Sequence, residues 1–195
     1  MKIPVSLLLA FGALSAPALD LTPSFVTVMS DGINIQRPYF SDSGKKYAVT
    51  LNVETELVPS EDGALFKFVK LKHAEMRLRP SSFSVEVMFG PDTLDRYQEA
   101  ARRLLPQNAE GVILEQQTKN PLPINGWASH RFVYKYTTPA GEVRESITFL
   151  NIIPSQQVVV QVYAAAKDFA DASERGYDII RRWHELDNAT VVRGN

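Results

Sequence analysis

The chain has 195 residues, its 21 lysines and arginines nearly balance its 22 aspartates and glutamates, and it contains no cysteine. A formal charge of −1 gives no long-range field that would attract nucleic acid or an anionic membrane. The lack of cysteine excludes disulfides, thiolate metal ligands, a cysteine nucleophile and a lipid-modified cysteine.

The N-terminus has the pattern of a secretory signal peptide: a lysine precedes a short apolar run, and the small residues Ala16 and Ala18 flank Pro17. We place the cleavage site after Ala18, because cleavage after Ala16 would leave a rigid proline at the first mature position. The alternative is an uncleaved anchor, but the apolar run is shorter than the roughly 20 residues that a spanning helix needs. We therefore expect a signal peptide, 1–18, and a periplasmic or secreted chain, 19–195, that forms one globular domain without a stable membrane span.

Residues 25–72 consist of short extended segments separated by turn signals. "FVTVM" precedes Asp31-Gly32, a dipeptide typical of tight hairpin turns, and "INIQ" follows it. Further strands are expected in "YAVTLNVETELV" and "ALFKFVKLK", where valine, threonine and aromatic residues are frequent. We expect this β-rich segment to be an N-terminal addition to the main fold.

After this region the spacing of apolar residues changes from that of a strand to that of a helix. Phe83, Val85 and Val87 alternate with polar residues, which predicts a strand. Apolar residues then recur at helical spacing across 93–105, after a Gly-Pro-Asp start that suits the first turn of a helix. Pro106 ends the predicted helix, because the residue before a proline avoids the helical conformation.

The stretch "INGWASHRFVYKYTTPAGEVRESITFL" alternates aromatic and charged side chains across a Pro/Gly turn. Phe132, Tyr134 and Tyr136 point to one face of the first strand, and the intervening charged residues point to the other. Ile147 and Phe149 continue the apolar face on the return strand. We therefore expect an antiparallel hairpin whose mixture of side chains is explained by one buried and one polar face.

The next segment, "QQVVVQVYAAA", has valines for both faces and is predicted to be a central strand. The closing helix has an apolar stripe formed by Phe169, Ala172, Gly176, Ile179, Ile180, Trp183 and Leu186. Strands, one helix, more strands and a closing helix predict the α+β class, with a mostly antiparallel β-sheet flanked by helices.

This order of elements resembles the PsbP-like α/β/α sandwich, shared by the PsbP subunit of photosystem II, the Ran-binding Mog proteins and the bacterial periplasmic protein DcrB. The residues that carry the resemblance are Asn125-Gly126-Trp127, Phe132 to Phe149, Val158 to Ala164 and Phe169 to Trp183. The strand-rich N-terminal segment is longer than the family pattern. The resemblance implies an accessory or assembly role without catalysis, and it supplies no catalytic residue.

No residue pattern predicts catalysis, a metal site or a cofactor. The histidines are His73, His130 and His184, and none lies within metal-ligand spacing of another. Ser129 directly precedes His130, so the two side chains point to opposite faces of a strand and cannot form a nucleophile–base pair. The G-x-S-x-G motif and the glycine-rich phosphate-binding loops do not occur.

Two pairs of carboxylates have simpler explanations than a glycosidase or calcium site. Asp168 and Asp171 suit the positive end of the closing helix. Glu54 and Glu56 suit one exposed face of a strand. Glycosidase chemistry would require two carboxylates facing one cleft, and calcium would require several oxygens in one loop.

The strongest candidate for binding is a basic cluster that consists of Lys67, Lys70, Lys72, Arg77 and Arg79. It could bind an anionic polymer, a lipid headgroup or an acidic partner. The simpler interpretation, which we favour, is a charged edge strand, where lysine discourages unwanted pairing. Trp127 is a second candidate: it either caps the sheet, as we favour, or presents an aromatic face to a partner.

Three functions remain open. The first is an exported, non-catalytic domain that binds or helps assemble an envelope component, with an unknown envelope protein or an anionic ligand as its partner and no nucleic acid. The second is a small-molecule or polysaccharide binder with a cleft between the sheet and helix 93–105. That cleft would be lost if Leu94, Tyr97 and Leu104 filled it. The third is an enzyme whose carboxylates or histidines come from distant segments.

Overall fold

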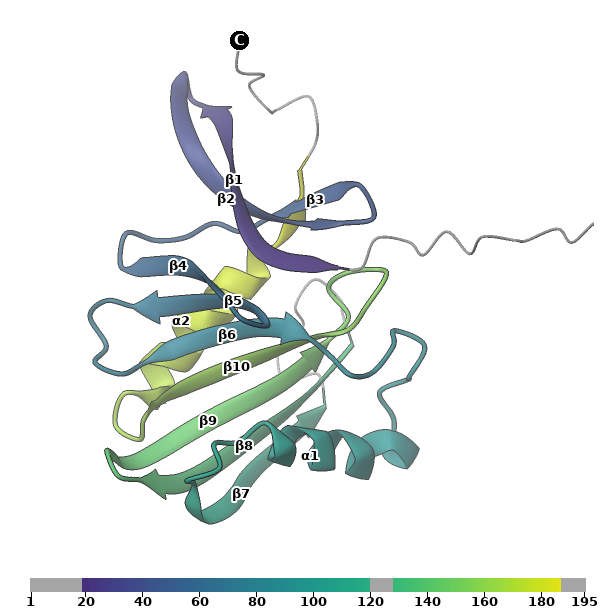
Figure 1. Ribbon diagram of the computed structural model, residues 1–195, viewed down its shortest axis with the longest axis vertical. Coiled ribbons are helices and arrows are strands. Elements are labelled where there is room, and N and C mark those ends of the chain that lie inside the picture. The colour runs from purple at the N-terminus through teal and green to yellow at the C-terminus, as the bar shows by residue number, and fades with distance from the viewer. Residues whose placement is uncertain (1–18, 120–127, 187–195) are drawn as a thin grey trace, which may run out of the picture.

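The computed structural model describes residues 19–119 and 128–186, which form two antiparallel β-sheets and two α-helices (Figure 1). The main sheet has seven strands in the order β4-β5-β6-β10-β9-β8-β7. Its strands are β4 (Thr55–Ser60), β5 (Gly63–Phe68), β6 (Glu75–Pro80), β7 (Glu110–Lys119), β8 (Ser129–Thr138), β9 (Gly141–Leu150) and β10 (Val158–Ala165).

A second sheet has four strands in the order β1-β2-β3-β11. Its strands are β1 (Asp20–Ser30), β2 (Ile33–Asp42), β3 (Lys45–Ala48) and β11 (His184–Glu185). The helices are α1 (Leu94–Arg103), which follows a single 3-10 turn at Pro91–Thr93, and α2 (Phe169–Arg181). The α+β class with a mostly antiparallel sheet and an extra β-rich N-terminal segment is thereby confirmed.

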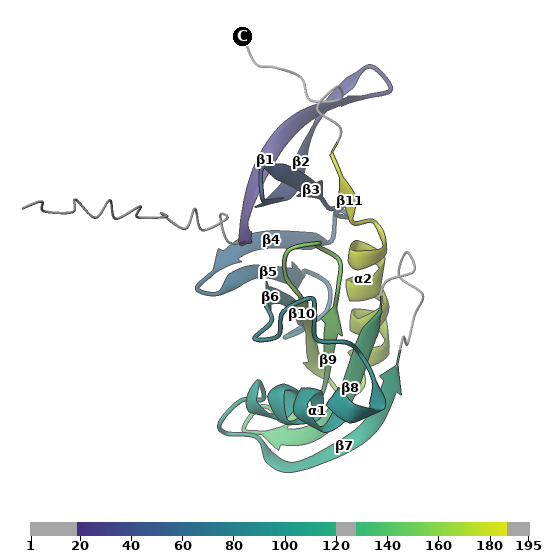
Figure 2. The same cartoon turned by 90° about the vertical axis from the view of Figure 1, so that its right-hand side faces the viewer.

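The two helices pack on opposite faces of the main sheet (Figure 2). We call these the α2 face and the α1 face. On the α2 face the apolar core contains Phe66, Met76, Leu78, Val160 and Val162 of the sheet, with Ile180 of α2 and Trp183 just after it. On the α1 face it contains Phe132, Tyr134, Ile147 and Phe149 of the sheet, with Tyr97 and Ala101 of α1. Strand β10 contributes valines to both cores, which explains why its sequence is apolar on each side.

The N-terminal segment divides between the two sheets. Strands β1 to β3 lie in the second sheet, whereas β4 and β5 extend the main sheet beyond β6. Phe40 of β2 stacks on Trp183, with ring centroids 5.2 Å apart and planes 8° from parallel. Leu19 and Leu21 belong to the same apolar core as Phe66 and Trp183, so the second sheet helps α2 to cover the α2 face.

Both predicted helices are present, although each ends earlier than its apolar pattern. α1 lies within the predicted 93–105. α2 ends at Arg181, and the chain then turns into β11, where the Leu186 N–H donates to the Lys46 carbonyl at 2.8 Å. Trp183 and Leu186 are buried as the stripe predicted, but they lie beyond the helix. Neither helix in the described part of the chain has the length and apolar character needed to cross a membrane.

The strand predicted from Phe83, Val85 and Val87 is wrong, because 81–90 form a loop over the α1 face. The Phe83 ring packs on the ring of Tyr97, with centroids 4.3 Å apart. The Val87 carbonyl accepts hydrogen bonds from the Tyr97 hydroxyl at 3.0 Å and the Gln157 amide at 3.0 Å. Side chains thus provide the hydrogen bonds of the Val87 carbonyl, which a partner strand would otherwise provide.

The aromatic hairpin is confirmed as β8 and β9, and Phe132, Tyr134 and Tyr136 are buried on the α1 face. Its other face is polar but lies under α2 rather than in solvent. Thr148 shares a hydrogen bond of 3.2 Å with the Tyr177 hydroxyl of α2. The Arg131 guanidinium lies 5.2 Å from the centroid of the Tyr177 ring, so polar pairs help to dock this helix.

Candidate functional site

At Tyr97 and Ala101, helix α1 packs directly on the sheet. Tyr97 and Ala101 of α1 have no exposed surface, and the Tyr97 hydroxyl is hydrogen-bonded to Gln157. Leu94 and Leu104 pack against the same core. The cleft expected beneath helix 93–105 is therefore closed at Tyr97 and Ala101. A small pocket of about 260 Å³ remains near the end of the helix, where Ala100 and Leu104 face Phe149 and Val159.

A cavity of about 590 Å³ opens where α1 ends. Leu104 and Pro106, which follow the helix, form one wall, and Pro139 in the β8–β9 turn forms another. Its remaining lining is mostly polar. Three neighbouring strands of the main sheet, β6, β10 and β9, supply five of these residues, and His73, Asn108, Thr138 and Ala140 complete the lining. This volume is in the range that small ligands occupy in proteins.

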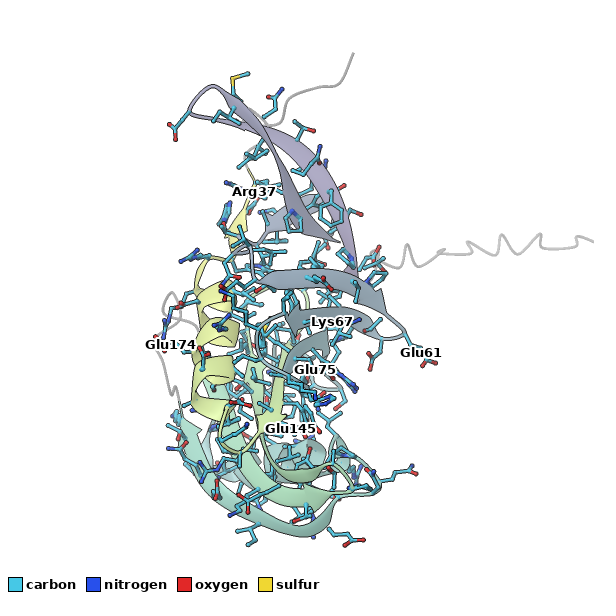
Figure 3. The ribbon with its side chains drawn as sticks, turned by 90° about the vertical axis from the view of Figure 1, so that its left-hand side faces the viewer. Arg37, Glu61, Lys67, Glu75, Glu145 and Glu174 are labelled. Atoms are coloured by element: carbon cyan, nitrogen blue, oxygen red, sulfur yellow. The ribbon has the colours of Figure 1, made fainter. Side chains whose placement is uncertain are left out.

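The strand register sets the polar residues of the cavity side by side. Tyr163 of β10 pairs with Glu75 of β6 on one side and with Glu145 of β9 on the other. In the next row, Gln161 of β10 pairs with Arg77 of β6. Directly paired residues point to the same face of a sheet, so all five line the cavity from the α1 face. Figure 3 shows Glu75 and Glu145 along this side of the sheet.

Glu145 is the most unusual residue of the cavity, because its carboxyl is buried, with 4% of the residue exposed. Its Oε2 accepts a hydrogen bond from the Tyr136 hydroxyl at 2.6 Å, and its Oε1 accepts one from the Gln161 amide at 2.7 Å. Burial raises the pKa of the Glu145 carboxyl above its ordinary value. The two hydrogen bonds and the charges of Arg77 and Arg79 oppose this shift in part.

Burial also raises the pKa of the Tyr136 phenol, and the neighbouring Glu145 carboxylate adds to the effect. The phenol therefore stays protonated and remains the donor in this pair. Together Tyr136 and Gln161 hold the carboxyl in one orientation at the floor of the cavity.

The sequence of β9 already indicates that Glu145 is unusual. The expectation of one buried and one polar face did not take this residue into account. Glu145 has the same parity as Val143, Ile147 and Phe149, all of which are buried on the α1 face. We expected the charges of the hairpin on the polar face. A carboxyl on the apolar face breaks that alternation, and such a break marks a position where packing alone does not explain the residue.

The structure divides the basic cluster between a sheet face and a loop. Lys67, Arg77 and Arg79 lie on the α1 face of β5 and β6, whereas Lys70 and Lys72 lie in the β5–β6 loop. The edge-strand interpretation is wrong, because β5 and β6 are interior strands and the edges of the main sheet are β4 and β7.

Ion pairs neutralise much of the cluster's charge. Arg77 pairs with Glu75 at 2.7 Å, Arg79 pairs with Asp62 at 3.0 Å, and Lys70 pairs with Glu54. The cluster is thus a mixed surface of both signs rather than a positive stripe.

Two other predicted positions, Trp127 and the cleavage site at Ala18, lie outside the described residues.

The carboxylate pairs form no shared site. Asp168 occupies the N-cap position of α2 without a side-chain cap, and Asp171 pairs with Arg175 at 3.0 Å. Glu54 also pairs with Arg175, at 2.7 Å, and its pKa is lowered by the hydrogen bonds from Lys70 and Arg175. Glu56 lies exposed on β4, so Glu54 and Glu56 have different surroundings.

The three histidines lie on separate elements. His73 lines the cavity and has a φ of 61°, a left-handed conformation that is uncommon outside glycine. His130 is buried among aromatic rings, with the Phe89 centroid 5.3 Å away and the Tyr97 centroid 5.5 Å away. His184 is exposed in β11. Within 19–119 and 128–186 no group of three histidine, aspartate or glutamate side chains has a metal-binding arrangement.

No protein-family model and no curated protein sequence matches the chain. Among solved structures, cyanobacterial PsbP (CyanoP) from Synechocystis sp. PCC 6803 is similar, with a TM-score of 0.51 and 7% identity over 72% of this chain and 86% of that one. LpqN of Mycobacterium tuberculosis, described as involved in cell envelope biogenesis, gives a TM-score of 0.49 and 11% identity over 73% and 84%. The Ran-binding protein Mog1p of Saccharomyces cerevisiae gives 0.35 and 10% over 89% and 100%.

The likeness to CyanoP confirms the predicted resemblance to the PsbP fold. At this level of identity it establishes the fold alone and carries no site residue to this chain.

Proposed function

We propose that the chain is an exported, non-catalytic domain that binds a component of the cell envelope through the α1 face of its main sheet. The observation that carries this proposal is the cavity at the end of α1, where polar side chains from three strands converge on one face. Ligand sites are usually concave, with apolar walls and a few polar groups that converge on the ligand.

The surroundings of Glu145 favour binding over acid–base chemistry. Both carboxyl oxygens already accept hydrogen bonds, from Tyr136 and Gln161. Proton transfer to or from Glu145 would have to change its protonation within these two hydrogen bonds. The same hydrogen bonds hold the carboxyl in one orientation, which suits its remaining acceptor positions to binding.

The exposed strands beside the cavity extend the proposed surface. Lys67 is exposed on β5, and Glu56 is exposed next to it on β4. Leu65 on the same face is only partly buried. A partner of the envelope would contact this mixed surface while a group of that partner, or a smaller ligand, occupies the cavity.

The envelope location rests on the N-terminal pattern, which is typical of a signal peptide cut after Ala18. Sequencing the N-terminus of the chain recovered from a periplasmic or culture fraction tests this part. A chain that begins at Leu19 supports export, and an intact leader in cytosolic material contradicts it.

Site-specific photocrosslinking tests the binding surface. A photoreactive amino acid at Lys67, on the α1 face, should capture a defined envelope component in intact cells. The same amino acid at Glu174, exposed on α2 on the opposite side of the sheet, is the matched control and should capture nothing in common with it (Figure 3). Equal products at both positions, or none at Lys67, would count against the proposal.

A further inference from the structure

We propose that the cavity binds a small ligand that carries a positively charged nitrogen, with Glu145 as the counter-ion of that nitrogen. This inference rests on the proposed function, because it names the kind of ligand that the same site accepts.

The lining of the cavity contains more carboxylates than guanidinium groups. Glu75 and Glu145 both line it, and Arg77 is the one arginine among the lining residues. Arg77 is already engaged by Glu75, with its Nε 2.9 Å from Glu75 Oε1. Arg79 on the same strand is engaged by Asp62 at 3.0 Å. Among the described residues, no lysine, arginine or histidine nitrogen forms an ion pair with Glu145.

Glu145 thus has hydrogen-bond donors but no ion-pair partner among the described residues, and the charges of Arg77 and Arg79 offset its burial only in part. A buried carboxylate is stabilised by donors, but it remains costly until an opposite charge compensates it. Tyr136 and Gln161 occupy one position on each carboxyl oxygen, and an ionised carboxylate has about four such positions. An ammonium group can use the unfilled positions and supply the missing charge at once.

Gln161 provides a second acceptor beside Glu145. Its amide nitrogen donates to Glu145, while its Oε1 is buried without a hydrogen-bond partner among the described residues. A nitrogen with several N–H groups can donate to both Glu145 and Gln161, which a carboxylate or phosphate cannot do. The acceptors of the cavity therefore favour a cation and disfavour an anion.

The walls limit the rest of the ligand. Leu104, Pro106 and Pro139 offer apolar surface, and Tyr163 offers part of an aromatic ring. Asn108 and Thr138 add groups that both donate and accept hydrogen bonds. A small polar body with an amine, such as an amino sugar or a short diamine, matches this lining.

Calorimetric titration with matched probes tests the charge requirement. Putrescine and glucosamine carry the ammonium group, while butane-1,4-diol and glucose have the same skeletons with a hydroxyl in place of each ammonium. We expect saturable binding of the two ammonium probes and none of the neutral ones.

Two variants assign the effect to Glu145. Glu145→Gln keeps the shape of the side chain and should weaken putrescine binding about tenfold or more, since a hydrogen-bonded charge is lost. Glu142→Gln removes the same charge from an exposed position on the same strand, where Glu142 pairs with Lys135 at 2.8 Å, and should bind normally. A thermal unfolding curve for each variant shows that it is folded.

Equal binding of charged and neutral probes, full affinity in Glu145→Gln, or no saturable binding of either ammonium probe would overturn the inference. Crosslinking from Lys67 separates this result from the proposed function. If crosslinks persist while the ammonium probes fail, the ligand class is wrong and the binding surface stands. If the probes bind but no envelope component is captured, the cavity is a ligand site and the proposed partner is wrong.

Discussion

The two faces of the main sheet differ in how completely they are covered. On the α2 face, α2 and the second sheet together bury a continuous apolar core that reaches from Phe66 on β5 to Val133 on β8. On the α1 face, the apolar core lies under α1 and the 81–90 loop, and polar side chains begin where α1 ends. The same sheet therefore has one closed face and one that is half open.

Simple dimensions explain the difference. A helix with its side chains is about 10 Å wide, so it covers two or three strands that are about 4.8 Å apart. A seven-stranded sheet needs more than one covering element on each face. The second sheet supplies this element on the α2 face, whereas β4, β5 and β6 lack one on the α1 face within the described residues. Glu145 and Gln161 lie at the boundary between the covered and the open part.

The largest predicted effect compares two leucines on neighbouring strands. Leu78 on β6 is fully buried in the core of the α2 face, and Leu65 on β5 is partly exposed on the α1 face. Leu78→Ala should lower the free energy of unfolding by about 3 kcal/mol, because it leaves a cavity in a packed core. Leu65→Ala should lower it by less than about 1 kcal/mol. Urea denaturation measures both, and equal losses would show that the faces are equally covered.

The second prediction concerns the buried carboxyl. The pKa of Glu145 is raised above its ordinary value of 4.5, so the folded state binds the proton more tightly than the unfolded chain. The stability that this provides is complete below about pH 4.5 and is lost as the pH rises through the folded pKa. Glu145→Gln should therefore gain stability relative to the native chain on going from pH 4 to pH 8.

Urea denaturation across this pH range checks the sign. Glu142→Gln, on the same strand but exposed, should show no such trend. A Glu145→Gln variant that loses stability relative to the native chain at high pH would mean that the carboxylate is compensated within the fold, and Glu145 would then need no counter-ion from a ligand.

Glu145 also shows how much of the site can be predicted from the sequence. Its parity with Val143 and Ile147 could be read from one strand, because side chains alternate along any strand. Its partners could not. Gln161 reaches it through the pairing of β9 with β10, and Arg77 approaches through the pairing of β10 with β6, which joins segments far apart in the chain.

The elements that the sequence predicted well were those with a local burial period, such as α1, α2 and the β8–β9 hairpin. The strand predicted at Phe83 failed because the same alternation can be satisfied by packing on Tyr97 without a partner strand. The basic cluster was placed on an edge because spacing shows neighbours along the chain but not the order of strands across a sheet.

The third prediction uses a buried base on the same face, with the opposite pH trend. Burial lowers the pKa of His130 below its ordinary value of 6.5, with the charge of Lys119 as a smaller contribution. The unfolded chain then binds the proton more tightly, and stability is lost as the pH falls below about 6.5. The slope attributable to His130 should not exceed about 1.4 kcal/mol per pH unit.

His130→Phe should flatten this acid-side loss, because a phenyl ring fits among Phe89, Tyr97 and Phe132 without titrating. His184→Phe is the control, since His184 is exposed and its loss should leave the slope unchanged. An unchanged slope in His130→Phe would mean that other groups cause the acid-side loss.

The smallest predicted effect compares two arginines that form ion pairs. Arg175 on α2 bridges Asp171 of its own helix and Glu54 beside β4, and its side chain is 21% exposed. Arg103 pairs with Glu99 on α1 and is 75% exposed. Arg175→Ala should cost about 1 kcal/mol, because it removes a link between α2 and the sheet that solvent screens only in part, whereas Arg103→Ala should cost less than about 0.5 kcal/mol. Repeating the urea denaturation at high salt should shrink the loss from Arg103→Ala more than that from Arg175→Ala. If salt shrinks both losses equally, Arg175 is no better shielded than a surface pair, and the α2 face is held by its apolar core and the Tyr177 contacts alone.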